Sequence, residues 1–201
     1  MKRIFVVVLF LFATINASAV FGQEEEENKA ARERTRGQLG KLLDRVGPVA
    51  NVSFSISQKH PDKYVGVLKT GLVNAEGMEI SIDVTPKETI EFRVYPHYKN
   101  AYLNLDKVND RASFMRMLLE LNSRTFLYWG ADESGDIFTG YTFTLESGFP
   151  EEAITVVLRS IVNSDKFVGE MRPILDAPIV PEVKPATKPA TKKKAPSRRG
   201  T

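Results

Sequence analysis

The sequence predicts an α+β domain in which an antiparallel sheet packs against helices. First, short segments with alternating apolar and polar residues follow one another between residues 52 and 94, as strands with one buried face do. Second, two later segments repeat apolar residues at the spacing of amphipathic helices. Third, an aromatic-rich hairpin separates these two helices. The expected element order is α-β-β-β-β-α-β-β-α.

The first predicted helix ends at Gly47-Pro48, because glycine followed by proline terminates helices. Its narrow apolar side consists of Leu39, Leu42, Leu43 and Val46. Gly37 and Gly40 lie inside the helix, and each weakens it by roughly 1 kcal/mol relative to alanine. We therefore expect the first half of this helix to be its weaker half.

Four strands are expected next, at residues 52–56, 64–68, 78–84 and 90–94. Turn-forming residues such as Pro61, Gly77 and Pro86 separate them. Because the connections are short, neighbouring strands run antiparallel and leave one face of the sheet in water.

The central helix is predicted from Asn109 onward, with its buried side formed by Phe114, Met117, Leu118 and Leu121. Residues 125–129 and 137–145 form the strands of the hairpin, and residues 132–136 form its turn. Pro150 opens the last helix, whose buried side consists of Ile154, Val157, Leu158 and Ile161. Pro173 is expected to close the ordered part.

The first 22 residues are predicted to be a signal peptide. Lys2 and Arg3 precede about twelve apolar residues, and Ala17-Ser18-Ala19 fits a cleavage signal. A membrane span needs about 20 apolar residues, so an N-terminal anchor is the weaker alternative. The chain has no cysteine, and a small exported domain without disulfides is typical of bacteria. We expect a periplasmic or secreted protein with no transmembrane segment after cleavage.

The remaining boundaries follow from charge and composition. Residues 23–38 form an acidic and otherwise charged segment, residues 39–175 the α+β domain, and residues 176–201 a disordered tail rich in Pro, Ala, Thr and Lys. Of the 28 Lys and Arg residues, two lie in the leader and seven in the tail, so residues 23–183 carry 19 against 25 acidic residues. The domain is therefore acidic, and only the tail is basic.

Several local sequences, in this order, resemble the YbjN-like domain family. They are residues 92–96, residues 118–122, residues 126–130 before the turn at 132–136, and the helix that begins after Pro150. The resemblance covers residues 39–175 and implies a fold similar to type III secretion chaperones of the CesT kind. It also implies a protein-binding or regulatory module, in a fold whose members form dimers and hold extended partner segments. The family brings no agreed catalytic residues.

The sequence favours no enzyme, cofactor or metal site. Only His60 and His97 are present, and neither lies in a metal-ligand spacing. A calcium loop that begins at Asp132 would need glycine at its sixth position and glutamate at its twelfth, where Ile137 and Phe143 stand. A hydrolase that uses carboxylates or a loop histidine is the weakest of the three functional hypotheses.

Two sets of residues are predicted to contact partners. The first set would contact another protein or a second copy in a homodimer, and consists of Phe126, Tyr128, Trp129, Tyr141 and Phe143. Core filling is the alternative for these side chains. The second set would tether the acidic domain to an anionic envelope polymer, and consists of Lys192, Lys193, Lys194, Arg198 and Arg199. We do not expect nucleic-acid binding, because no aromatic residues interleave with the basic ones.

Overall fold

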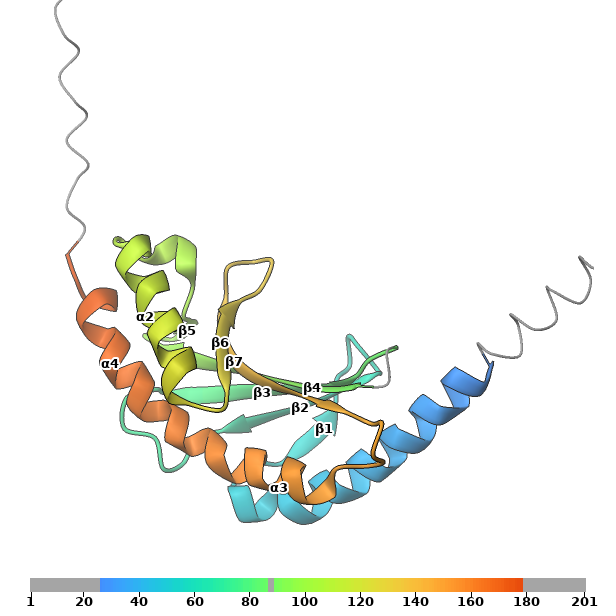
Figure 1. Cartoon of the computed structure of the whole chain (residues 1–201). Helices are drawn as coiled ribbons and strands as arrows, with labels where there is room; N and C mark the ends of the chain where they lie inside the picture. Colours follow the sequence, from blue (N-terminus) through green and yellow to red (C-terminus); the bar gives the residue numbers. More distant parts are fainter. Residues whose placement is uncertain (1–25, 87–88, 179–201) are drawn as a thin grey trace, which may run out of the picture.

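The structure, a computed structural model, describes residues 26–86 and 89–178 (Figure 1). The predicted signal peptide and the five predicted tether residues lie outside this part of the chain. Within it, the predicted α+β class is confirmed: helices pack against an antiparallel sheet, in roughly the expected order.

The first helix is described over residues 26–46 and continues without a break through both of its interior glycines. Gly40 is the point at which strand β2 (Lys63–Leu68) approaches this helix. A Cβ there would lie 2.6 Å from the hydroxyl oxygen of Tyr64, which donates a hydrogen bond to the carbonyl of Arg36 at 3.1 Å. The glycine that weakens the isolated helix therefore lets the helix pack against the sheet.

The sheet has seven strands, which pair in the order β1-β2-β3-β4-β7-β6, while β5 pairs with one end of β4. Every pair is antiparallel. The strands are β1 (Phe54–Ile56), β2 (Lys63–Leu68), β3 (Gly77–Val84), β4 (Thr89–Tyr98), β5 (Ala101–Tyr102), β6 (Tyr128–Ala131) and β7 (Ile137–Thr144). The two-residue strand β5 was not predicted.

Three α-helices follow or interrupt the sheet: α2 (Arg111–Arg124), α3 (Glu151–Ser160) and α4 (Asp165–Leu175). Short 3-10 helices lie at η1 (Pro48–Ala50), η2 (Leu105–Lys107) and η3 (Ile161–Ser164). The predicted last helix corresponds to α3, and after η3 a further helix, α4, forms where none was predicted. Pro173 lies inside the last turns of α4 rather than ending the ordered chain.

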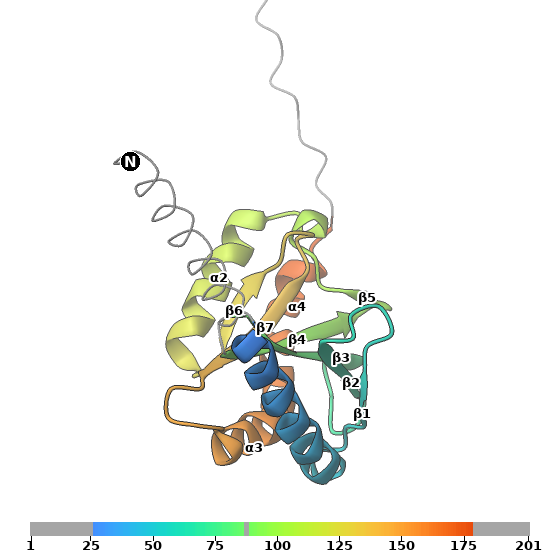
Figure 2. The same cartoon turned by 90° about the vertical axis from the view of Figure 1, so that its right-hand side faces the viewer.

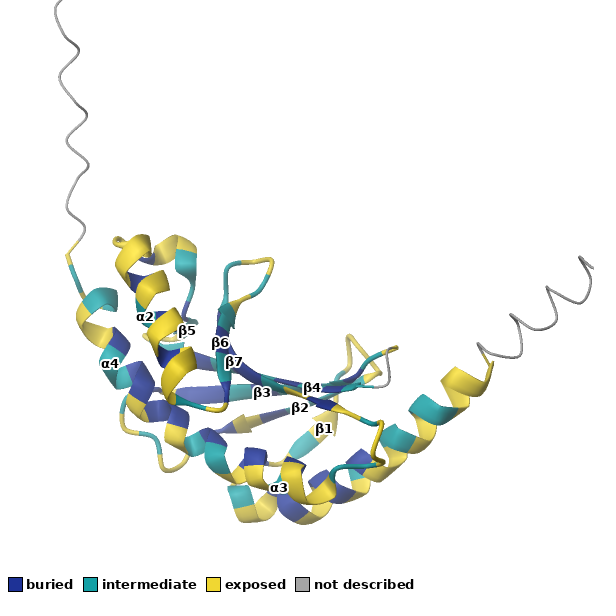
Figure 3. Cartoon of the chain, in the orientation of Figure 1, coloured by how far each residue is buried: buried dark blue, intermediate teal, exposed yellow. Residues whose placement is uncertain are grey.

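The helices form an arc along one side of the twisted sheet, and the other side carries no helix (Figures 1 and 2). The core lies between the arc and the sheet (Figure 3). Strand register determines which side chains enter it: Ile90 pairs with Phe143, and Val94 pairs with both Ile80 and Thr139. Alternate residues on β4 therefore point to the core, and those between them point to the open face of the sheet.

Candidate protein-binding surface

Helix α2 carries apolar side chains on two sides. Phe114, Leu118 and Leu121 face the core and are buried. Met115 and Leu119, four residues apart and therefore on one face, are 51% and 69% exposed.

Phe126, in the loop after α2, is 56% exposed, and its ring lies 6.0 Å from that of half-buried Tyr141. We call Met115, Leu119, Phe126 and Tyr141 the α2 patch. Isolated exposed apolar residues are common, but large apolar side chains exposed together on one helix and the loop directly after it are candidates for an interaction site.

The structure divides the five predicted aromatic residues among three places. Phe126 and Tyr141 belong to the α2 patch. Trp129 and Phe143 are only 4% and 5% exposed, so they fill the core and cannot anchor a partner. Tyr128 points to the opposite, open face of the sheet, because it pairs with Gly140 while its neighbour Trp129 pairs with Thr139.

Two charged side chains flank the exposed side of α2 without a salt-bridge partner. Arg116 and Glu120 are exposed, and neither forms an ion pair within 4 Å in the described part of the chain. Near the end of the same helix, by contrast, Arg124 donates hydrogen bonds of 2.7 and 2.9 Å to Glu170 of α4. This pair lowers the pKa of the Glu170 carboxyl. Arg116 and Glu120 are therefore available to a partner.

The two edges of the sheet differ. At the β6 edge, the Asn122 side chain of α2 bonds the strand backbone: its Oδ1 accepts from the Trp129 N–H at 2.5 Å and its Nδ2 donates to the Trp129 carbonyl at 3.2 Å. The Asn122 amide thus makes the two backbone hydrogen bonds that a further strand would make to Trp129. This edge is closed to pairing.

At the β1 edge, no described strand pairs with the outer side. The Ser57 N–H donates to the Lys63 carbonyl at 2.8 Å, so Ser57 is a bonded position of the β1–β2 pair. Bonded and non-bonded positions alternate along an antiparallel pair, so the N–H and C=O groups of Phe54 and Ile56 point outward.

A groove of about 770 Å³ runs beside this edge. It is lined by serines of β1 and its flanks and by Val65, Val67 and Glu79 of the open face. Ile56 and Val67 are 53% and 39% exposed. The edge therefore combines free backbone groups with exposed apolar side chains.

The open face also carries an aromatic cluster that the sequence did not predict. Phe138 is buried against the rings of Tyr95 at 5.7 Å and Tyr128 at 5.8 Å, and the guanidinium of Arg93 lies 4.9 Å from its centre. Nearby, the Tyr102 hydroxyl donates to Glu79 at 2.6 Å. Burial and this hydrogen bond to a carboxylate raise the pKa of Tyr102. Alternation along β4 and β7 is the signal for this cluster, once the core face is known.

The two histidines lie in different surroundings, one in a turn and one beside an aromatic ring. The backbone N–H of exposed His60 donates to the Ser57 hydroxyl at 3.3 Å, within a turn. His97 packs edge-on against the ring of Tyr102 at 4.6 Å. The Asp132 carboxylate accepts from the backbone N–H groups of Ser134 and Asp136, so it stabilises the hairpin turn. Among the described residues, no group of three His, Asp or Glu side chains is placed to hold a metal ion.

No family model, no curated protein and no solved structure matches the chain. Within residues 26–86 and 89–178, no helix has the length and apolar character needed to cross a membrane.

Proposed function

We propose that this chain is an exported, non-enzymatic protein-binding module that holds an extended segment of another protein along strand β1. The proposal is chaperone-like in the sense of the YbjN-like resemblance. The observation that carries it is the contrast between the two sheet edges. One edge is closed by Asn122, while the other presents unpaired backbone groups beside a groove.

The backbone of a bound segment would pair with Phe54 and Ile56, because outward N–H and C=O groups are complementary to an extended polypeptide and to little else. Alternate side chains of that segment would lie over the groove and against Ile56 on the other side. Because the pairing uses backbone groups, segments of many different sequences can bind. The apolar contacts favour segments with apolar side chains at the matching positions. Export rests on the predicted signal peptide.

Replacing Ile56 with proline is expected to reduce peptide binding at least tenfold. Proline removes the outward N–H of Ile56 and leaves the bonded positions Ser55 and Ser57 unchanged, which an edge strand tolerates. The measurement is recovery of peptides from a random extended-peptide library on immobilised protein. Ile56→Thr is the matched control, because it keeps the N–H and the branched side chain. Equal recovery by the proline variant and the control would contradict the proposal.

A second copy of the chain is the partner that the α2 patch favours. Two α2 helices that pack antiparallel about a two-fold axis bring Met115 and Leu119 of one copy against the same residues of the other. The same arrangement places Arg116 of one copy close to Glu120 of the other. Both charges, which lack an ion pair within the described chain, would then be paired.

Reversing the charge of Arg116 is therefore expected to weaken self-association, and reversing both charges to restore it. The dissociation constant should rise at least fivefold in Arg116→Glu and return to within about twofold in Arg116→Glu/Glu120→Arg, because the exchanged charges attract each other again. Val156→Ser is the control, because it alters a comparably exposed apolar residue on α3, outside the α2 patch. Sedimentation velocity measures all four proteins. A monomeric wild type, or a double variant as weak as the single one, would exclude this dimer.

A further inference from the structure

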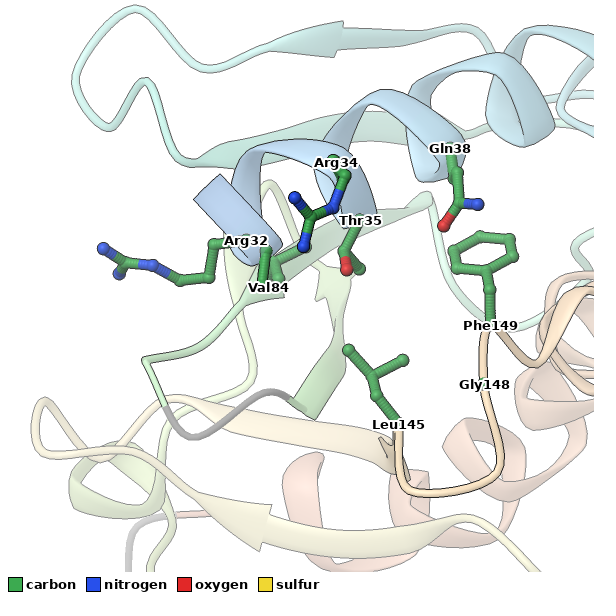
Figure 4. Close-up of a pocket in the computed structure, with 9 residues that line it drawn as sticks. Arg32, Arg34, Thr35, Gln38, Val84, Leu145, Gly148 and Phe149 are labelled. Atoms are coloured by element: carbon green, nitrogen blue, oxygen red, sulfur yellow. The ribbon is translucent and has the colours of Figure 1, made fainter. Parts of the chain in front are cut away.

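A hollow of about 280 Å³ lies between the first helix and the loop that joins β7 to α3 (Figure 4). It is separate from both the β1 groove and the α2 patch. Its floor is apolar: Val84 of β3 is buried, and Leu145 and Phe149 of the loop are partly buried against the core. Gly148, where an added Cβ would meet nothing within 4 Å, leaves one side open.

The helical wall of the hollow is lined by hydrogen-bond donors. Thr35 and Gln38 extend from the helix toward Leu145 and Phe149, and the guanidinium of Arg34 lies beside Val84, whereas Arg32 extends away (Figure 4). Residues three and four positions apart are neighbours on a helix surface, so Gln38 lies next to both Thr35 and Arg34. The guanidinium, the hydroxyl and the amide therefore border the same hollow above its apolar floor.

The three donors have no partner among the described residues. Within residues 26–86 and 89–178, the side chains of Arg34, Thr35 and Gln38 make no hydrogen bond and no ion pair. Arg36, on the neighbouring side of the same helix, pairs with both Glu33 and Asp62. The arginine on the hollow side is thus left without the carboxylates that its neighbour Arg36 pairs with.

We infer that this hollow binds the carboxylate of a small amphiphilic molecule, a short apolar chain that ends in a single carboxylate group. The guanidinium of Arg34 accommodates one carboxylate with two parallel hydrogen bonds, and Thr35 and Gln38 donate to its remaining lone pairs. The chain lies against Val84, Leu145 and Phe149. The volume corresponds to roughly nine water-sized groups, which limits the chain to about six carbons.

A carboxylate fits better than a phosphate for reasons of charge. One guanidinium faces the hollow and Arg32 turns away from it, so a single negative charge is neutralised and a second one is not. An uncharged alcohol of the same length would leave the guanidinium unpaired beside apolar groups. Both the charge and the chain are therefore required.

The test is a methyl NMR titration of the full chain with hexanoate, hexanol, hexyl phosphate and inorganic phosphate. Hexanoate is expected to shift the methyl signals of Val84 and Leu145 and to bind at least tenfold more tightly than the other three probes. Arg34→Gln should weaken hexanoate binding at least tenfold. Arg159→Gln, which changes an exposed arginine of α3 that also lacks an ion pair, should leave binding unchanged.

Four results would overturn the inference. If hexanol binds as tightly as hexanoate, the apolar chain alone is enough for binding. If inorganic phosphate does so, a charged group alone is enough. Tighter binding of hexyl phosphate would replace the carboxylate with a phosphate ligand. If Arg34→Gln and Arg159→Gln weaken hexanoate binding equally, the net charge of the protein and not the hollow determines the affinity.

Discussion

Replacing Asp165 with asparagine is expected to lower the free energy of unfolding by about 3 kcal/mol. Asp165 is 5% exposed at the start of α4 and binds the loop between β2 and β3. Its carboxylate accepts from the backbone N–H groups of Val73 at 2.8 Å, Asn74 at 3.0 Å and Ala75 at 2.7 Å. An asparagine keeps one acceptor oxygen and turns an NH2 group toward these donors, so part of the buried and part-buried N–H groups of the loop lose their partner.

Urea unfolding followed by the fluorescence of Trp129 measures this loss, since Trp129 is the only tryptophan and is buried. Asp44→Asn is the matched control, because Asp44 is exposed on the first helix and accepts no hydrogen bond from the described residues. We expect the control to change stability by less than about 0.5 kcal/mol. Equal midpoints for the two variants would mean that the Asp165 contacts contribute nothing to folding.

Replacing Gly140 with alanine is expected to cost about 2 kcal/mol. Gly140 lies in β7 between Arg93 of β4 and Tyr128 of β6. A Cβ there would lie 2.5 Å from the carbonyl oxygen of Phe92 and 3.0 Å from the ring of Tyr128. The carbonyl belongs to the neighbouring strand, so it cannot move aside without disturbing the β4–β7 pairing.

Gly130 in β6 provides the matched control, because its nearest atom to an added Cβ is in the Phe138 ring at 3.5 Å. That distance is ordinary van der Waals contact, and Gly130→Ala should change stability by less than about 0.5 kcal/mol. Thermal unfolding of both variants gives the comparison. A Gly140 variant as stable as the Gly130 variant would show that β7 shifts freely.

The sheet was predictable from the sequence because each of its main strands has one buried face. Met78, Ile80 and Ile82 alternate with polar residues, and all three are fully buried. Strand β5 has no such pattern: it is two residues long and exists because Tyr102 pairs with His97 at the end of β4. Helix α4 was also missed, because Pro173, a residue that normally ends helices, lies inside it.

The candidate surface was less predictable, because alternation separates the two faces of a strand without showing which one the helices cover. Trp129 and Phe143 lie on the covered face, and Tyr128 on the open one. Only the position of the helical arc decides between them. The hollow beside Arg34 gave no sequence signal, because its floor comes from β3 and from a loop that lies more than 100 residues after Arg34 in the chain.

The first helix is held unevenly along its length, and this affects how the hollow is exposed. Leu39, Leu42, Leu43 and Val46 anchor its second half in the core. Its first half makes few contacts, of which the strongest join Arg36 to Asp62 and to the carbonyl of Pro61. Segments that bury little surface have a low free energy of local unfolding. Amide protons of residues 26–35 can therefore exchange with solvent while the core stays intact, and an occupied hollow would slow that exchange.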